Sequence, residues 1–136
     1  MRKLITAMKV PLDGKFERTD SPADWVNAWS DDYGLTPQID ASVLGAGMYP
    51  LYEKYWTSIQ TEPERPAWIT SAPPTLTELK SASFAKKKPH YVLSSTATSA
   101  TWPNTKFLRS LGEIAALKNQ PCKDIYLAGA QELQRA

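Results

Sequence analysis

A short apolar run that leads into a glycine turn and then a helix constrains the fold more than any other feature. Residues 41–44 (ASVL) form the run, Gly45 and Gly47 follow it, and a helical pattern opens at Met48. This order is typical of a buried strand that ends at a helix N-terminus. The free backbone N–H groups and the helix dipole at such a turn favour a phosphate group.

A second copy of the arrangement lies near the other end of the sequence, in residues 124–133 (DIYLAGAQEL). Either turn alone is also consistent with ordinary tight-turn packing between a strand and a helix. Two such turns in one small sheet suggest a long anionic ligand.

Length and charge define the class of protein only broadly. With 136 residues, 42% of them apolar, the chain is predicted to form one domain, residues 1–136. The net charge of +2 does not distinguish between partners. Residues 86–88 form a run of lysines without interleaved aromatic residues, which is typical of a solvated helix end, with a ligand role as the alternative. We therefore expect no nucleic-acid partner.

The remaining composition points to a reducing compartment. Cys122 is the single cysteine, which excludes an internal disulfide, and His90 is the single histidine and directly precedes an expected strand. Neither a catalytic thiol nor a metal site is expected. The apolar run after Arg2 and Lys3 ends at Lys9, so neither a signal peptide nor a membrane span fits. We expect a cytoplasmic protein without a membrane partner.

Strands and helices are expected to alternate along the chain, which predicts an α/β domain with a largely parallel sheet and right-handed crossovers. Ligands of such sheets bind beyond the carboxyl ends of the strands. Strands are expected at 4–10, 41–44, 91–94 and 125–128, and helices from Ser21 to Gly34, from about Pro50, from about Thr75 to Lys87 and from Ser110 to Lys118. The expected irregular stretches are 11–21, a surface excursion at 61–74 around Trp68 and Ile69, and 95–104 with Trp102 anchored against the core.

Four segments carry a family resemblance in the right order over essentially the whole chain. ITAMKVPLDGKF resembles the first strand and loop of the dihydrofolate reductase superfamily, VLGAGMYP its pyrophosphate-holding strand and helix, YVLSSTAT its adenosine-side strand, and DIYLAGAQEL its glycine turn beneath the cofactor. The chain is similar to the small dihydrofolate-reductase-like proteins akin to the reductase domain of bifunctional riboflavin-biosynthesis deaminase-reductases.

The resemblance implies a three-layer fold with a mostly parallel central sheet. It also implies an NADPH-dependent reductase, commonly a homodimer, that transfers hydride to a small pterin-like or pyrimidine-like substrate in riboflavin- or folate-type metabolism. The residues that it places around the cofactor are Thr6 and Ala7 at the nicotinamide amide, Asp13 and Gly14 in a mobile loop over it, Gly45, Ala46, Gly47 and Met48 at phosphate, Leu93, Ser94 and Ser95 beside the adenosine, and Gly129, Ala130 and Gln131 at the pyrophosphate.

The sequence departs from the family pattern at three places. Ala46 stands where relatives often have arginine, so recognition of a 2′-phosphate would depend on Lys106, Arg109 or the lysine run. Ala128 stands where many members have a glycine. The sequence ends at Ala136, before the further strands of the family, so the domain is expected to lack its last strands. NADH or a flavin-type cofactor is therefore kept as an alternative to NADPH.

Asp24 is the candidate catalytic carboxylate, because SPADW resembles the start of the helix that carries the substrate acid in dihydrofolate reductases. Its position three residues after Ser21 also fits a helix-capping role. Trp25 and Tyr52 are candidates to wall a planar substrate, although their helical spacing also fits core packing. The alternative function is a non-enzymatic nucleotide-binding or interaction domain that kept the fold.

Overall fold

The computed structural model describes residues 1–7, 9, 12–13, 31–67 and 71–128. The described elements are five strands and three helices, which alternate broadly as the sequence predicts. In chain order they are β1 (Leu4–Ile5), β2 (Ile39–Gly45), α1 (Tyr49–Thr61), α2 (Leu76–Lys87), β3 (His90–Leu93), β4 (Thr105–Leu108), α3 (Leu111–Lys118) and β5 (Asp124–Ala128).

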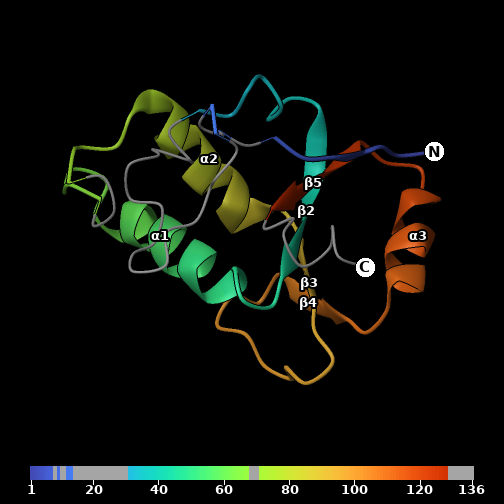
Figure 1. The fold of residues 1–136 in the computed structure, drawn as a ribbon. Helices are drawn as coiled ribbons and strands as arrows, with labels where there is room; N and C mark the ends of the chain where they lie inside the picture. Colours follow the sequence, from blue (N-terminus) through green and yellow to red (C-terminus); the bar gives the residue numbers. More distant parts are fainter. Residues whose placement is uncertain (8, 10–11, 14–30, 68–70, 129–136) are drawn as a thin grey trace.

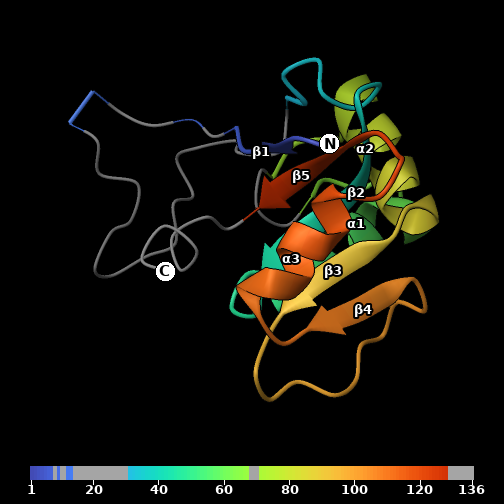
Figure 2. The same cartoon turned by 90° about the vertical axis from the view of Figure 1, so that its right-hand side faces the viewer.

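The five strands form one sheet in the order β1-β5-β2-β3-β4, and every neighbouring pair is parallel. Helices α1 and α2 cover one face of the sheet and α3 lies on the other (Figures 1 and 2). The prediction of an α/β domain with a largely parallel sheet is confirmed at this level. Because the strands are parallel, all their carboxyl ends lie along one edge of the sheet.

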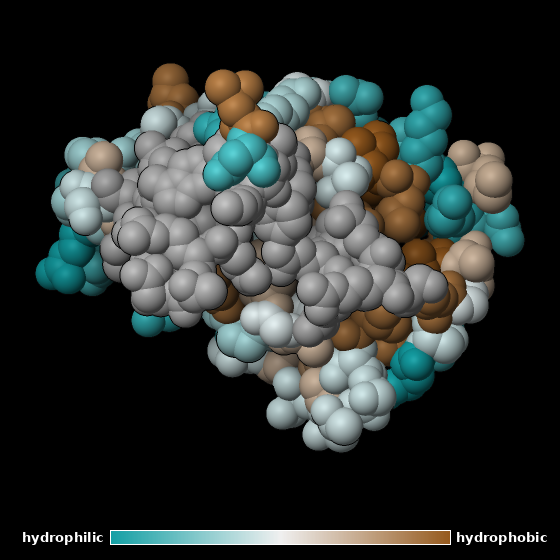
Figure 3. All heavy atoms as spheres, in the orientation of Figure 1, coloured by the Kyte–Doolittle hydropathy of each residue, from teal (hydrophilic) through white to brown (hydrophobic). Residues whose placement is uncertain are grey.

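The central strand β2 is buried on both faces, as its apolar sequence predicts. Leu44 packs with the aromatic residues of α1, including Tyr55 and Trp56. Val43 points to the other face and packs with Ile114 and other residues of the α3 side. Apolar side chains also gather at the surface on the side of α3 (Figure 3). Four partly buried residues pack against the core cluster that contains Val43 and Ile114: Leu4, Tyr91, Leu93 and Leu127.

The structure differs from the predicted strands at two places. The strand expected at 4–10 ends at Ile5. β1 is an edge strand with β5 as its neighbour, and the Ala7 carbonyl accepts a hydrogen bond from the Tyr126 hydroxyl rather than from the backbone of a neighbouring strand. The irregular stretch expected from residue 95 does run to residue 104, and Trp102 is buried as predicted, but strand β4 follows it and was not predicted.

The helix predicted up to Gly34 does not include residues 31–34, whereas residues 21–30 lie outside the described part. The Asp31 and Asp32 carboxylates accept hydrogen bonds from the backbone N–H groups of Tyr33, at 2.8 Å, and Gly34, at 3.0 Å. These local bonds favour a turn over a helix. Tyr33 and Gly34 have positive φ angles of 50° and 69°, which a helix does not allow.

The helix ends agree more closely with prediction. Helix α2 begins with a complete capping box between Thr75 and Glu78. At α3 the predicted box is half formed, because the Ser110 side chain accepts from the Glu113 N–H while Glu113 accepts from the Arg109 N–H. Residues 86–88 are exposed at the C-terminal end of α2, as predicted. None of the helices in the described residues is long and apolar enough to cross a bilayer.

Candidate functional site

The candidate site lies along the carboxyl edge of the sheet, where the register of four strands brings separate segments of the chain together. Leu44 in β2 pairs with Ala128 in β5, and Gly45 pairs with Leu93 in β3. Leu93 in turn pairs with Leu108 in β4. The segments that follow these residues therefore begin side by side. They include three of the cofactor segments expected from the sequence, of which residues 129–131 lie outside the described part.

The turn after β2 leads directly into α1. Gly45 is buried and Gly47 is exposed, and the Met48 N–H donates to the Gly45 carbonyl at 3.1 Å. Met48 caps α1 without a side-chain hydrogen bond, and the first turn contains no acidic residue. Pro50 lacks an N–H, so it removes one possible donor. The remaining N–H groups and the helix dipole form a weakly positive end that favours an anion.

The segment after β3 forms a compact turn. The Ser94 hydroxyl accepts hydrogen bonds from the N–H groups of Thr96, at 3.3 Å, and Ala97, at 3.0 Å. Ser94 is buried and its hydroxyl is used by this turn, whereas Ser95 is exposed. Of these two predicted residues, Ser95 is therefore the one whose side chain is accessible to a ligand.

Arg109 brings a positive charge to the same edge. It directly follows β4, and its Nη1 donates to the Ser94 carbonyl at 2.6 Å. Its guanidinium lies 5.6 Å from the ring centroid of Phe107. The lysine run, by contrast, precedes β3 and so lies at the opposite edge of the sheet. Among the basic groups considered from the sequence, Arg109 is the one that follows the carboxyl end of a strand, since Lys106 lies within β4.

The residues expected at the nicotinamide follow β1. Thr6 is exposed and Ala7 is partly buried, and the Tyr126 hydroxyl donates to the Ala7 carbonyl at 3.1 Å. Burial raises the pKa of Tyr126 to about 12, so this hydroxyl is a hydrogen-bond donor across the physiological range. Asp13 is exposed in a turn, and its partner Gly14 lies outside the described residues.

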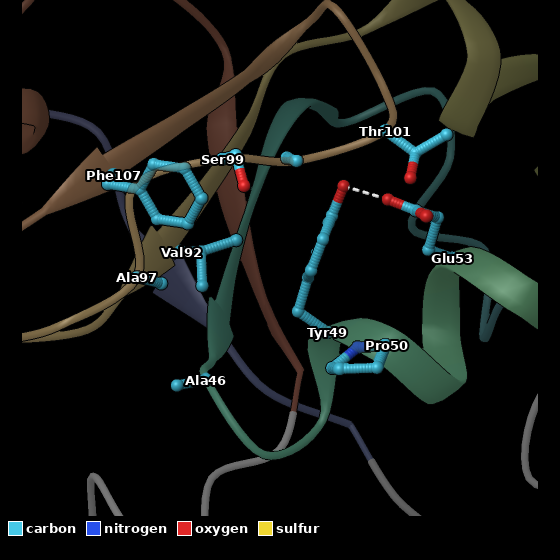
Figure 4. Close-up of a pocket in the computed structure, with 10 residues that line it drawn as sticks. Ala46, Tyr49, Pro50, Glu53, Val92, Ala97, Ser99, Thr101 and Phe107 are labelled. Carbon is cyan, nitrogen blue, oxygen red and sulfur yellow. Dashed lines mark hydrogen bonds between the residues drawn. The ribbon is translucent and has the colours of Figure 1, made fainter.

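A cavity of about 410 Å³ opens between the first turn of α1 and the loop after β3 (Figure 4). This volume lies within the range of small-molecule sites. Ala46, from the turn after β2, is part of its lining. In Figure 4, Tyr49 stands between Phe107 and Val92 on one side and Glu53 and Thr101 on the other.

Tyr49 is held by polar contacts at its hydroxyl group. It donates to the Glu53 carboxylate and lies 3.0 Å from the Thr105 Oγ1. Trp102 contacts the ring edge-on, with centroids 6.4 Å apart. Burial, followed by the bond to Glu53, raises the pKa of Tyr49 to about 12. The phenol therefore remains protonated and fixes the carboxylate at the cavity wall.

Tyr52, one of the candidate substrate residues, lies outside this cavity. Tyr52 is buried and lines a second cavity of about 60 Å³ together with Asp31, Asp32 and Tyr126. This volume suits water better than a heteroaromatic ring. Asp24 and Trp25 lie outside the described residues, so their roles stay predictions.

Sequence reasoning did not find the Tyr49–Glu53 pair. Their spacing of four residues on one helix face is visible in the sequence and was the available signal. The cavity that they line depends on residues 97–101, which are distant in sequence, so spacing alone did not indicate a site.

Comparison with models of known protein families gives no match, and no match is found among curated proteins. Within the described ranges of the chain, no group of three or more His, Cys, Asp or Glu side chains is placed to hold a metal ion.

Proposed function

We propose that this chain is a dihydrofolate-reductase-like domain that uses NAD(P)H to reduce a small pterin-like or pyrimidine-like ring. The observation that carries the proposal is the register of Leu44 with Ala128 in neighbouring strands. Leu44 directly precedes one glycine-containing segment of the sequence and Ala128 directly precedes the other. A ligand with two linked phosphate groups matches this arrangement better than one with a single charge.

The charge and position of several described residues support this proposal. The N-terminus of α1 offers backbone donors to phosphate, and the exposed Ser95 adds a hydroxyl nearby on the same edge. Arg109 supplies the positive charge that Ala46 does not, and its position at the end of β4 suits a 2′-phosphate on the adenosine side. We therefore expect NADPH to be preferred to NADH through Arg109.

The nicotinamide supplies the hydride, so the protein has to orient the two rings and provide one proton. Backbone groups of Thr6 and Ala7, at the end of β1, are proposed to orient the nicotinamide amide. The Tyr126 hydroxyl stabilises this segment through the Ala7 carbonyl. Asp24 is the proposed proton source for the substrate.

Calorimetric titration with NADPH, NADH and a flavin nucleotide tests the proposal directly. NADPH should bind most tightly. R109Q should lower the affinity for NADPH at least about tenfold, because it removes one charge-assisted bond, and should leave the affinity for NADH nearly unchanged. R65Q is the matched control, because Arg65 is exposed and pairs with Glu62 beyond the C-terminal end of α1. Absence of NADPH and NADH binding would overturn the proposal.

Turnover separates the reductase from the alternative. Oxidation of NADPH in the presence of pterin or aminopyrimidine substrates would support the reductase. Tight NADPH binding without turnover of any such substrate would instead favour a nucleotide-binding domain that retains the fold.

A further inference from the structure

The 410 Å³ cavity beside α1 adjoins the turn that is proposed to hold phosphate. Ala46 belongs to both the turn and the cavity lining, and Tyr49 is the first residue of α1. A group attached to a phosphate at this turn therefore reaches the cavity without crossing the sheet.

The lining of the cavity selects against a second phosphate and for a planar ring. Val92, Ala97 and Phe107 supply apolar surface, and Tyr49 supplies an aromatic wall. Among the described residues that line the cavity, Glu53 carries the one charge. These lining residues include no lysine, arginine or histidine. A ring that offers N–H donors would satisfy Glu53, whereas an anion would be repelled.

Glu53 is positioned to accept a bond from a ligand. Its Oε2 accepts the bond from the Tyr49 hydroxyl, which is itself close to Thr105. A carboxylate has lone pairs for about four acceptor bonds, so one bond from Tyr49 leaves capacity for a ligand amine. The edge contact between Tyr49 and Trp102 holds the same ring from another direction.

The strand order indicates which end of a dinucleotide would enter this cavity. Thr6 and Ala7, the proposed nicotinamide contacts, follow β1 at one side of the sheet, whereas Val92 and Phe107 lie in β3 and β4 at the other. The turn after β2 lies between them. Three strand spacings separate β1 from β3, about 14 Å in all, and an extended dinucleotide spans this distance.

We propose that this cavity binds the purine base of the dinucleotide, and that Glu53 selects adenine through its exocyclic amino group. The inference rests on the proposed function and adds the residue that distinguishes adenine from other purine bases. Adenine donates a hydrogen bond from this amino group, whereas hypoxanthine presents a carbonyl oxygen at the same position. The hypoxanthine oxygen and the Glu53 carboxylate are both hydrogen-bond acceptors and repel each other, so the hypoxanthine base is disfavoured.

The experiment compares binding of NADPH with binding of its hypoxanthine counterpart to the full chain by calorimetry. The wild-type protein should prefer the adenine form at least about tenfold. E53A should bring the two affinities within about threefold of each other. E53Q should reduce or reverse the preference, because its amide can donate to the hypoxanthine oxygen. E62A, directly after the C-terminal end of the same helix, is the matched control and should keep the wild-type preference.

The outcomes distinguish the inference from the proposed function. Equal binding of both dinucleotides by the wild-type protein, or an unchanged preference in E53Q, overturns the inference and leaves dinucleotide binding intact. If neither dinucleotide binds but adenosine binds more tightly than inosine, and E53A abolishes this difference, the proposed function fails and the base site stands. If neither the dinucleotides nor adenosine bind, both fail. Thermal unfolding of each variant confirms that it is folded.

Discussion

Leu44 and Ala128 are direct partners in two parallel strands, although they come from distant parts of the sequence. Their pairing places the end of β5 beside the end of β2, in the middle of the sheet. The residues that follow Leu44 begin the turn into α1, whose N-terminus has no side-chain cap among the described residues. This relationship makes the strands that precede the two glycine-containing turns neighbours, which neither motif indicates by itself.

A negative charge in the turn after β2 should oppose phosphate binding. Gly47 is exposed, so G47D adds a carboxylate without burying it. We expect NADPH affinity to fall at least about tenfold, because the carboxylate occupies the helix end that favours an anion. G112D is the matched control, because it adds the same carboxylate to the first turn of another helix, α3. Gly112 has a φ angle outside the left-handed region, so aspartate can replace it without backbone strain. Equal affinity in G47D and wild type, measured by calorimetry, would contradict the phosphate role.

The buried ion pair between Arg2 and Asp40 should contribute substantially to stability. The Arg2 side chain is 4% exposed and that of Asp40 is 23% exposed. Arg2 also donates to the Lys123 carbonyl, and Asp40 accepts from the Lys123 N–H at 3.1 Å. D40A should lower the free energy of unfolding by about 2–3 kcal/mol, less than a fully buried pair because Asp40 is partly solvated.

A double variant separates pairing from packing at this ion pair. R2M/D40A leaves no unpaired buried charge, and the methionine retains part of the arginine stem, so it should be more stable than D40A alone. Urea unfolding of the two variants measures the difference. Equal or lower stability of R2M/D40A would show that the unpaired charge is not what destabilises D40A.

Glu78 should contribute more to stability than the ordinary partner of a helix cap. It is 2% exposed, accepts from the Thr75 N–H at 2.7 Å and also accepts from the Tyr55 hydroxyl. T75A removes a cap alone and should cost about 1 kcal/mol. E78A also removes the acceptor for a buried phenol and should cost about 2–3 kcal/mol. Denaturant unfolding that ranks T75A as the more damaging change would contradict this role.

Sequence patterns predicted the central strands and most helix ends because local chemistry determines them. β2 and β5 are apolar runs followed by glycine-containing segments, and the starts of α2 and α3 have capping residues. β4 was missed because it is a short edge strand whose Lys106 is exposed, so it has little apolar pattern. Residues 31–34 were misassigned because aspartate side chains compete with a helix for backbone N–H groups.

The candidate site was predictable only in part. The turn after β2 could be read from its glycines, but the adjacency of β5 and β2 depends on long-range packing across the sheet. The position of Arg109 depends in the same way on β4, which the sequence did not reveal. The cavity beside Tyr49 is formed by the loop that precedes β4, so no local pattern predicts it.

His90, the single histidine, should make the fold sensitive to mild acid. It is fully buried at the start of β3, with the rings of Tyr52 and Trp102 at centroid distances of 5.6 and 5.0 Å. Burial lowers its pKa from 6.5 to about 4, against a weaker opposing effect of the Lys88 backbone. The native state therefore disfavours the imidazolium, which the unfolded chain forms readily below pH 6.5.

The sign of the pH dependence follows from this difference. Above pH 6.5 His90 is neutral in both the folded and the unfolded state, and its contribution to stability is complete. Below pH 6.5 the unfolded chain binds an extra proton at His90, so the free energy of unfolding falls as pH falls. The slope should be about 1.4 kcal/mol per pH unit and should level off near pH 4, where native His90 is itself protonated. H90F, or H90Q if the phenyl ring does not fit, should show a flatter profile between pH 6.5 and 4.5. Denaturant unfolding across this range decides the matter: the same slope in wild type and in a folded variant at position 90 would assign the acid sensitivity to other groups.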